Sequence, residues 1–155
     1  MISTELKNGV MPFHAEDMLW IIQDGIKEFG IKCIPTEQMV ELAETREANG
    51  QCITGWVDGH VVGCGGIDMM WPGVGEVWMF LSYETDKYPV KAFRVIKKGI
   101  DKLIQDNDLW RCQAWCGKNF TQGHTLFRHL KFKPEGVAER YMSDGTDAIL
   151  YARIK

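Results

Sequence analysis

The stretch that decides the fold of this chain is LWRCQAWCGKNFTQGHTLFRHLKFKPEG, residues 109–136. Its first part, 109–115, is mostly apolar with partial alternation, which predicts a strand. A helix is predicted over 119–130, and the Pro- and Gly-containing segment 132–136 is typical of a turn that closes it. The stretch therefore predicts a strand, a helix and a turn in immediate succession.

Upstream of that stretch, the sequence predicts two helices before the central strands. A short polar strand at 4–13 precedes a helix at 15–29, whose end is expected at Gly30 because glycine commonly follows the last helical turn. Thr36 is a suitable cap for a second helix that runs to about residue 49. Two consecutive helices are thus expected near the N-terminus.

The centre of the chain carries a strong hairpin signal. Asp58-Gly59 lies between two apolar runs, 51–57 and 60–69, and this dipeptide favours a tight turn between antiparallel strands. The remaining elements are a strand at 76–81, a helix that begins at Pro89 and ends at 107–108, and strands at 137–142 and 147–154 joined by the loop 143–146. The predicted order is β-α-α-β-β-β-α-β-α-β-β in a single α/β domain covering residues 1–155.

Composition excludes several functional classes. The 18 basic and 21 acidic residues are evenly spread, so no basic stripe predicts a nucleic-acid partner. No run approaches the roughly 20 apolar residues that cross a bilayer, so no membrane association is expected. The five cysteines include no Cys-x-x-Cys pair and are expected to be free thiols in a reducing compartment, the cytoplasm. Cys52, Cys64 and His60 lack a fourth ligand, and no metal is expected.

The decisive stretch and the order of elements resemble the GNAT superfamily of N-acetyltransferases. Residues 110–115, Asn119 and the pair at 135–136 look like parts of that family's fifth strand, fourth helix and following turn. The family pattern is roughly Asn-x-x-Ala-x-x-Phe-Tyr-x-x-x-Gly-Phe, then Glu-Gly. Here Asn119 lies one residue early, Phe127 takes the tyrosine place and Lys131 the glycine place. The resemblance implies a mixed, mainly antiparallel sheet flanked by helices.

This resemblance implies acetyl transfer from acetyl-CoA to an amine, on either a small molecule or a protein. In the family the fourth strand separates from the fifth to admit the pantetheine arm, and 76–81 is that strand by position. The backbones of Met79, Phe80 and Leu81 are then expected to line the groove. Glu76 is the candidate general base, since a carboxylate must take a proton from the amine. Asn119 is expected to hold the pantetheine region.

The segment that holds the CoA diphosphate in this family departs from the pattern. The family uses a glycine-rich loop whose N–H groups face the phosphates. This chain reads SYETDKYPVKA at 82–92, with no glycine and two carboxylates. Lys87 and Lys91 are the candidates for meeting the phosphates. Phe127 cannot protonate the leaving thiolate, and His124, one turn earlier, is the candidate substitute.

A second class of function stays open. The run 110–136 also resembles small acetyltransferase-like proteins of tailed phages, among them internal virion proteins. This alternative is a catalytically inactive domain that acts as a virion or interaction protein.

Trp71 is expected to shape substrate access or a partner surface, whereas a thiol nucleophile at Cys116 is disfavoured because it lacks an orienting group. A homodimer through the last strand is also an expectation from the resemblance.

Overall fold

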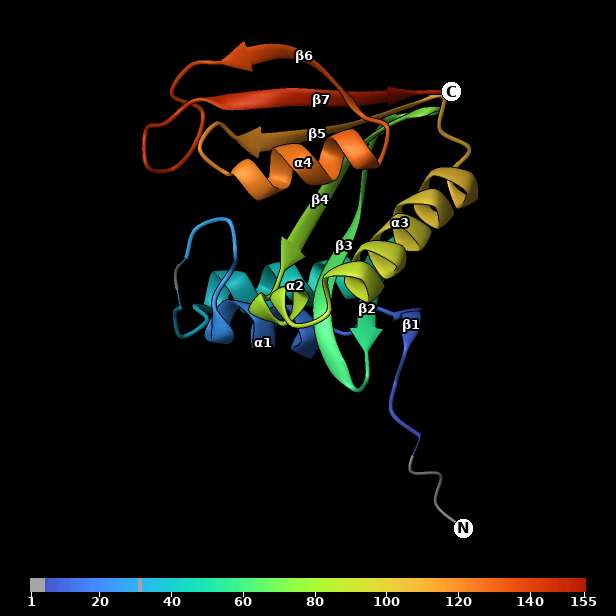
Figure 1. Cartoon of the computed structure of the whole chain (residues 1–155), viewed down its shortest axis with the longest axis vertical. Coiled ribbons are helices and arrows are strands. Elements are labelled where there is room, and N and C mark those ends of the chain that lie inside the picture. The colour runs from blue at the N-terminus through green and yellow to red at the C-terminus, as the bar shows by residue number, and fades with distance from the viewer. Residues whose placement is uncertain (1–4, 31) are drawn as a thin grey trace. The chain divides into compact units, whose positions relative to one another are not determined.

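The computed structural model describes residues 5–30 and 32–155 of the chain (Figure 1). Within these ranges, strands are hydrogen-bonded in the order β1 (Gly9–Pro12), β2 (Cys52–Val57), β3 (His60–Trp71), β4 (Val74–Leu81), β5 (Arg111–Gly117), β7 (Ala148–Ile154) and β6 (Lys133–Ala138). β4 and β5 run parallel, whereas β1–β2, β2–β3, β5–β7 and β6–β7 run antiparallel. The mixed, mainly antiparallel sheet is confirmed.

The helices follow the predicted order. They are α1 (Ala15–Asp24), α2 (Glu37–Asn49), α3 (Pro89–Asp106) and α4 (Thr121–His129), with a short 3-10 helix, η1 (Tyr83–Asp86), that the sequence did not indicate. Within the described ranges, none of these helices is long and apolar enough to cross a membrane.

The chain divides into two compact units, each with its own part of the sheet. The first unit extends to Gly66 and includes Met79–Leu103, and the second contains Ile67–Trp78 and Ile104–Lys155. The first unit therefore holds α1, α2, η1 and most of α3, and the second holds α4 and the last three strands. Both units contribute residues to β3 and β4.

The first helix is shorter than the sequence predicts. α1 ends before Gly25, which takes a φ of 117° and donates its N–H to the carbonyl of Ile21 at 2.8 Å. The chain then turns, and the N–H of Lys27 donates to the carbonyl of Leu81 at 3.0 Å. The positive φ of Gly25 takes the backbone out of the helix, so the predicted end at Gly30 is wrong, and the Lys27 hydrogen bond holds the turn that follows. The predicted strand at 4–13 is reduced to β1, and residue 4 lies outside the described residues.

The start of α1 is tied to β2 by buried polar groups. The carboxylate of Asp17 accepts from the N–H of His14 at 3.1 Å and from the hydroxyl of Thr54 at 2.7 Å. Both Asp17 and Thr54 are buried. Because a hydrogen bond to a charged group is worth about 1.5–3 kcal/mol, this arrangement fixes the helix on the sheet.

Two local predictions in the first unit are confirmed. The hydroxyl of Thr36 accepts from the N–H of Met39 at 3.3 Å, and Gly50 ends α2 with a φ of 69°. Asp58 and Gly59 have φ values of 48° and 79°, which is the left-handed geometry of a tight hairpin turn. Short-range sequence signals determine both features.

The prediction for the penultimate strand is wrong. β6 begins at Lys133, inside the segment predicted as a turn, and pairs with β7 from Lys133↔Ala152 to Ala138↔Ala148. Lys131 takes a φ of 69° and turns the chain directly after α4. Pro134 is tolerated because β6 is the outermost strand at this end of the sheet order, where one edge needs no donor. β7 is consequently paired on both sides within the chain.

The sheet of the second unit has two different faces. Along β5, Cys112, Ala114 and Cys116 are buried, whereas Arg111, Gln113 and Trp115 are half-buried. Tyr151 pairs with Ala114 and stacks on Phe127 of α4 with ring centroids 5.1 Å apart, so α4 covers the buried face. We call this the α4 face and the other, which carries Trp115, the opposite face.

All five cysteines are free thiols, as predicted. Burial raises the pKa of the Cys112 thiol to about 12 and also raises that of Cys64. These thiols therefore stay protonated, and Cys112 and Cys64 behave as small apolar residues of the core.

Candidate active site

β4 and β5 are paired over only part of their length. The parallel ladder joins Val74 to Arg111, Gly75 to Cys112 and Glu76 to Gln113. Within the described residues it ends there, although β4 continues to Leu81 and β5 continues to Gly117. β5 stays paired with β7 through Gly117, so only its ladder with β4 is interrupted. Glu76 is the last residue of β4 in that ladder.

Glu76 is a half-buried carboxylate whose proton affinity is increased. Burial raises its pKa above the ordinary value, and repulsion from the Asp68 carboxylate raises it further. The indole N–H of Trp115 donates a hydrogen bond to Glu76 and offsets part of this increase. A carboxylate with a raised pKa is better matched to accepting a proton from an amine near neutral pH.

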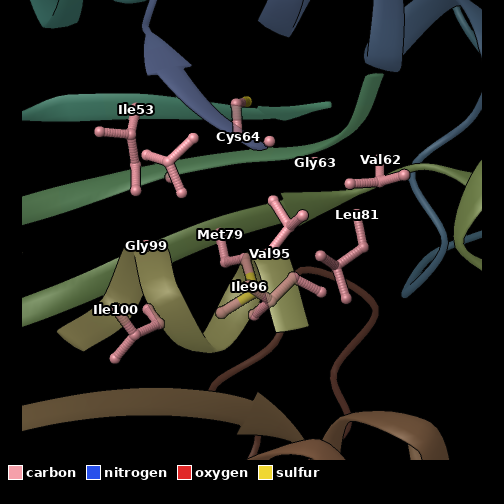
Figure 2. Close-up of a pocket in the computed structure, with 13 residues that line it drawn as sticks. Ile53, Val62, Gly63, Cys64, Met79, Leu81, Val95, Ile96, Gly99 and Ile100 are labelled. Atoms are coloured by element: carbon pink, nitrogen blue, oxygen red, sulfur yellow. The ribbon is translucent and has the colours of Figure 1, made fainter. Parts of the chain in front are cut away.

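In the first unit, the end of β4 packs against α3. The side chains of Met79 and Leu81 line a small apolar hollow together with residues of β2, β3 and α3, and Val95 and Ile96 extend into it from the helix (Figure 2). The ring of Phe80 lies under the guanidinium of Arg46, 5.9 Å from the ring centroid. Met79 and Leu81 therefore contribute side chains to the core, and the carbonyl of Leu81 already accepts from the N–H of Lys27.

The segment between β4 and α3 is held by a network that includes Lys27. Ser82 is fully buried, donates its hydroxyl to the carbonyl of Val61 at 2.6 Å and accepts from the N–H of Glu84 at 3.3 Å. The ammonium of Lys27 donates to the hydroxyl of Thr85 at 2.8 Å and pairs with the carboxylate of Asp86. These contacts form η1 in the position where the family resemblance expects a glycine-rich loop.

Both lysines expected to meet phosphates are already paired. The ammonium of Lys87 lies 3.2 Å from the carboxylate of Glu84, and that of Lys91 lies 3.3 Å from Asp58. Glu84 also faces the imidazole of His60 at 3.8 Å. The positive charge at the start of α3 is thus partly neutralised by carboxylates of the first unit.

In the second unit, His124 has both ring nitrogens engaged. Its Nε2 lies 2.8 Å from the carbonyl of Lys118 and its Nδ1 lies 2.6 Å from the hydroxyl of Tyr151. Because a carbonyl only accepts, Nε2 carries a hydrogen, and in the neutral ring the Tyr151 hydroxyl then donates to Nδ1. Burial raises the pKa of Tyr151, so this hydroxyl keeps its proton.

The other two predicted residues lie near His124. Phe127 is buried between Tyr151 and Phe132, with ring centroids 5.1 Å and 5.3 Å away. Asn119 is exposed in the turn before α4, and its main-chain carbonyl accepts from the N–H of Thr121 at 3.1 Å.

The structure does not bring the two predicted catalytic side chains to one face. Glu76 pairs with Gln113 and so faces the same side as Trp115, whereas His124 contacts Tyr151 on the α4 face. Glu76 and His124 therefore belong to two different environments of the second unit.

Sequence reasoning missed three residues around Glu76. Asp68 repels its carboxylate, Trp115 donates a hydrogen bond to it, and Tyr141 stacks on Trp115 with ring centroids 4.7 Å apart. The alternation of Trp115 with buried Ala114 and Cys116 was the available signal that its side chain lies on a different face. No local signal indicated Asp68 or Tyr141, because the sheet brings them there.

Trp71 occupies a different exposed surface of the second unit. It is 60% exposed and lines a hollow with Met70, Pro72 and the 57% exposed Trp110. The indole of Trp110 lies directly against the backbone of Gly73. Within the described residues, no group of three or more His, Cys, Asp and Glu side chains is arranged to hold a metal ion.

Comparison with known proteins gives a match in structure but none in sequence. No family model matches the sequence, and no curated protein sequence matches it significantly. Ard1 from Thermoplasma volcanium superposes with a TM-score of 0.73 at 15% identity, covering 94% of this chain and 95% of that chain.

Three further solved structures are similar, with TM-scores of 0.68 to 0.71. A ribosomal-protein-alanine N-acetyltransferase from Brucella melitensis gives a TM-score of 0.71 at 14% identity, covering 94% of this chain and 99% of that chain. A ribosomal-protein-S5-alanine acetyltransferase from Vibrio fischeri gives 0.68 at 18% identity, with coverages of 99% and 97%. An acetyltransferase described as of the GNAT family, from Streptococcus pneumoniae, also matches. The chain therefore has the GNAT acetyltransferase fold.

Proposed function

We propose that this chain is an acetyl-CoA-dependent N-acetyltransferase with Glu76 as its general base. The observation that carries the proposal is the end of the β4–β5 ladder at a carboxylate with a raised pKa. In a fold shared with acetyltransferases, a strand edge released at this point offers main-chain N–H groups to a thioester carbonyl. Glu76 lies beside that released edge.

The proposed reaction follows from these groups. Glu76 accepts a proton from the protonated amine, and the freed nitrogen lone pair then attacks the thioester carbon of acetyl-CoA. The new C–N bond forms as the C–S bond breaks, and the proton that the attacking nitrogen then loses passes through water to the departing CoA thiolate. Within Met79, Phe80 and Leu81, the main-chain N–H groups that point away from β3 are the proposed donors to the carbonyl oxygen, because successive N–H groups of a strand point to opposite edges. Lys118 and Tyr151 engage His124, so we assign the thiolate proton to water.

The residues present fit the thioester end of acetyl-CoA better than its diphosphate end. The first turn of α3 leaves the N–H groups of Val90 and Lys91 without helical partners, which suits an anion. Lys87 and Lys91 supply charge only after they release Glu84 and Asp58. We therefore propose weaker donor binding than a glycine-rich loop would give, with Asn119 holding the pantetheine region.

Calorimetric titration with acetyl-CoA and with CoA tests the proposal. Saturable binding is expected, together with thiol release from acetyl-CoA in the presence of an amine. Because two structural neighbours carry names that refer to alanine of ribosomal proteins, the acceptor panel should include peptides with a free N-terminal alanine. Glu76→Gln is expected to keep donor binding and lose turnover. Equal turnover in that variant removes Glu76 from the mechanism.

A specific observation favours a second candidate, an inactive phage or prophage domain that acts as a virion or interaction protein. Glu84 and Asp86 place two carboxylates in the segment that the resemblance expects to meet phosphates, and Lys87 and Lys27 pair with them. The exposed surface at Trp71 and Trp110 offers contact area for a partner. No detectable heat with acetyl-CoA at millimolar concentration would favour this candidate over the enzyme.

A further inference from the structure

The opposite face of the second unit carries an aromatic pair beside two carboxylates. Tyr141, in the loop after β6, stacks on Trp115 with ring centroids 4.7 Å apart and planes inclined by 20°. The indole N–H of Trp115 is hydrogen-bonded to Glu76, and Asp68 lies within electrostatic range of the same carboxylate. The stacked rings, Glu76 and Asp68 therefore form one continuous group, which we call the acceptor cluster.

The negative charge of the acceptor cluster has no counterion of its own. Arg111 is on the same face, but its guanidinium makes two hydrogen bonds to Glu135, at 2.6 and 3.0 Å, and one to Gln113 at 3.1 Å. Throughout ranges 5–30 and 32–155, no lysine or arginine forms an ion pair with Asp68 or Glu76. A bound cation would relieve the repulsion between these two carboxylates.

The aromatic part of the cluster suits the same kind of ligand. Tyr141 is 54% exposed although its ring stacks on Trp115, so part of the side chain is accessible to a ligand. Aromatic faces attract ammonium groups within about 6 Å and also pack against aliphatic chains. A ligand with an ammonium head on an apolar stem therefore matches both halves of the cluster.

We propose that the acceptor is a primary ammonium on an aliphatic stem, with the ammonium between Asp68 and Glu76 and the stem along Tyr141 and Trp115. This inference rests on the proposed acetyltransferase function, because it assigns the acceptor of the same site. Glu76 removes the proton of the bound ammonium, whereas the exposed side chain of Asp68 keeps the cation in place. Asp68 and Tyr141 are thus specificity-determining residues, and Trp115 is a positioning residue.

The same chemistry occurs in two sources, a free diamine and the side chain of a lysine in a protein. Three probes separate charge from shape and one source from the other: 1,5-diaminopentane, Nα-acetyl-lysine amide and the uncharged 1,5-pentanediol. The two amines share a flexible stem and a primary ammonium, and the diol has the stem alone. Preference for the lysine amide over the diamine points to a protein acceptor, and the reverse points to a free diamine.

Binding is measured by the indole N–H resonance of Trp115 in a ¹⁵N-labelled protein, assigned with the Trp115→Phe variant. The amines are expected to shift this resonance saturably and the diol is not. Asp68→Asn is expected to weaken amine binding about 5-fold or more, since one unit charge at contact distance is removed. Asp68 is exposed, so the variant retains its fold. Tyr141→Ala is expected to weaken binding of both amines.

Asp144→Asn is the control for charge, because it removes the same charge from an exposed loop carboxylate that accepts from the N–H and the hydroxyl of Thr146. Equal effects of Asp68→Asn and Asp144→Asn, or equal binding of the diol, overturn the inference. Acetyl-CoA titration of the same samples separates the two proposals. Donor binding without amine binding overturns the acceptor assignment and leaves the transferase function standing. Amine binding without donor binding overturns the transferase function, and the acceptor role falls with it.

Discussion

Replacing Glu84 by glutamine is expected to strengthen the binding of CoA. The carboxylate of Glu84 pairs with Lys87 at 3.2 Å, at the segment proposed to meet the CoA diphosphate. Glutamine keeps the size of the side chain and removes its charge. The substitution therefore releases the ammonium of Lys87 and eliminates a carboxylate that repels the phosphates.

The size of the effect follows from the two contributions. The Lys87 ammonium is largely exposed, so breaking its pair with Glu84 costs only about 0.2–1 kcal/mol. Repulsion between the carboxylate and one phosphate charge is worth about 1 kcal/mol at 4 Å in water. Together these contributions give about 1–2 kcal/mol, which is an approximately 5- to 30-fold decrease in Kd.

The assay is calorimetric titration with CoA at low and high salt. The gain is expected to shrink as salt rises, because exposed charges are screened within about 10 Å at 0.1 M. Glu44→Gln, an exposed position on α2 of the same unit, is the control for net charge. An unchanged Kd in Glu84→Gln, or an equal change in Glu44→Gln, refutes the assignment of this segment to the diphosphate.

The remaining predictions concern the base and the second unit. Asp68→Asn removes repulsion and lowers the pKa of Glu76, so the acidic limb of the kcat/KM profile is expected at lower pH, because the base must be ionised to act. Trp115→Phe removes a hydrogen bond that lowers the pKa of Glu76, so the acidic limb of the kcat/KM profile is expected at higher pH. A shift of the limb in the same direction in both variants would contradict the assignment of Glu76 as the base. Gly73→Ala is expected to lower the free energy of unfolding, measured in urea, by about 2–4 kcal/mol. Gly73 has a left-handed φ of 87°, and an added Cβ would overlap the indole of Trp110. Gly136→Ala, where a Cβ meets nothing within 4 Å, is the control and is expected to change it by less than about 0.5 kcal/mol.

The fold was predictable because its signals are local and mutually consistent. The cap at Thr36, the Asp58-Gly59 turn and the start of α3 at Pro89 all appear as expected. Each depends on residues within a few positions of one another, so the backbone preference of the chain determines them. The order of strands and helices then leaves few topologies, and the mixed sheet is among them.

The errors occur where distant residues decide the local structure. α1 ends at Gly25, five residues early, where the N–H of Lys27 turns to the carbonyl of Leu81, and pairing with β7 draws Pro134 into a strand. Neither interaction leaves a mark in the periodicity of its own segment. The same holds for η1, which forms around the buried hydroxyl of Ser82.

By itself, the sequence determined the element order, the free thiols and the identity of Glu76 as a candidate base. Only the tertiary structure decided which groups surround that base, because Asp68, Trp115 and Tyr141 come from three separate segments that the sheet and its loops bring together. It also decided that Lys87 and Lys91 are paired with carboxylates. Burial and charge compensation depend on distances between remote residues, and a linear pattern does not specify those distances.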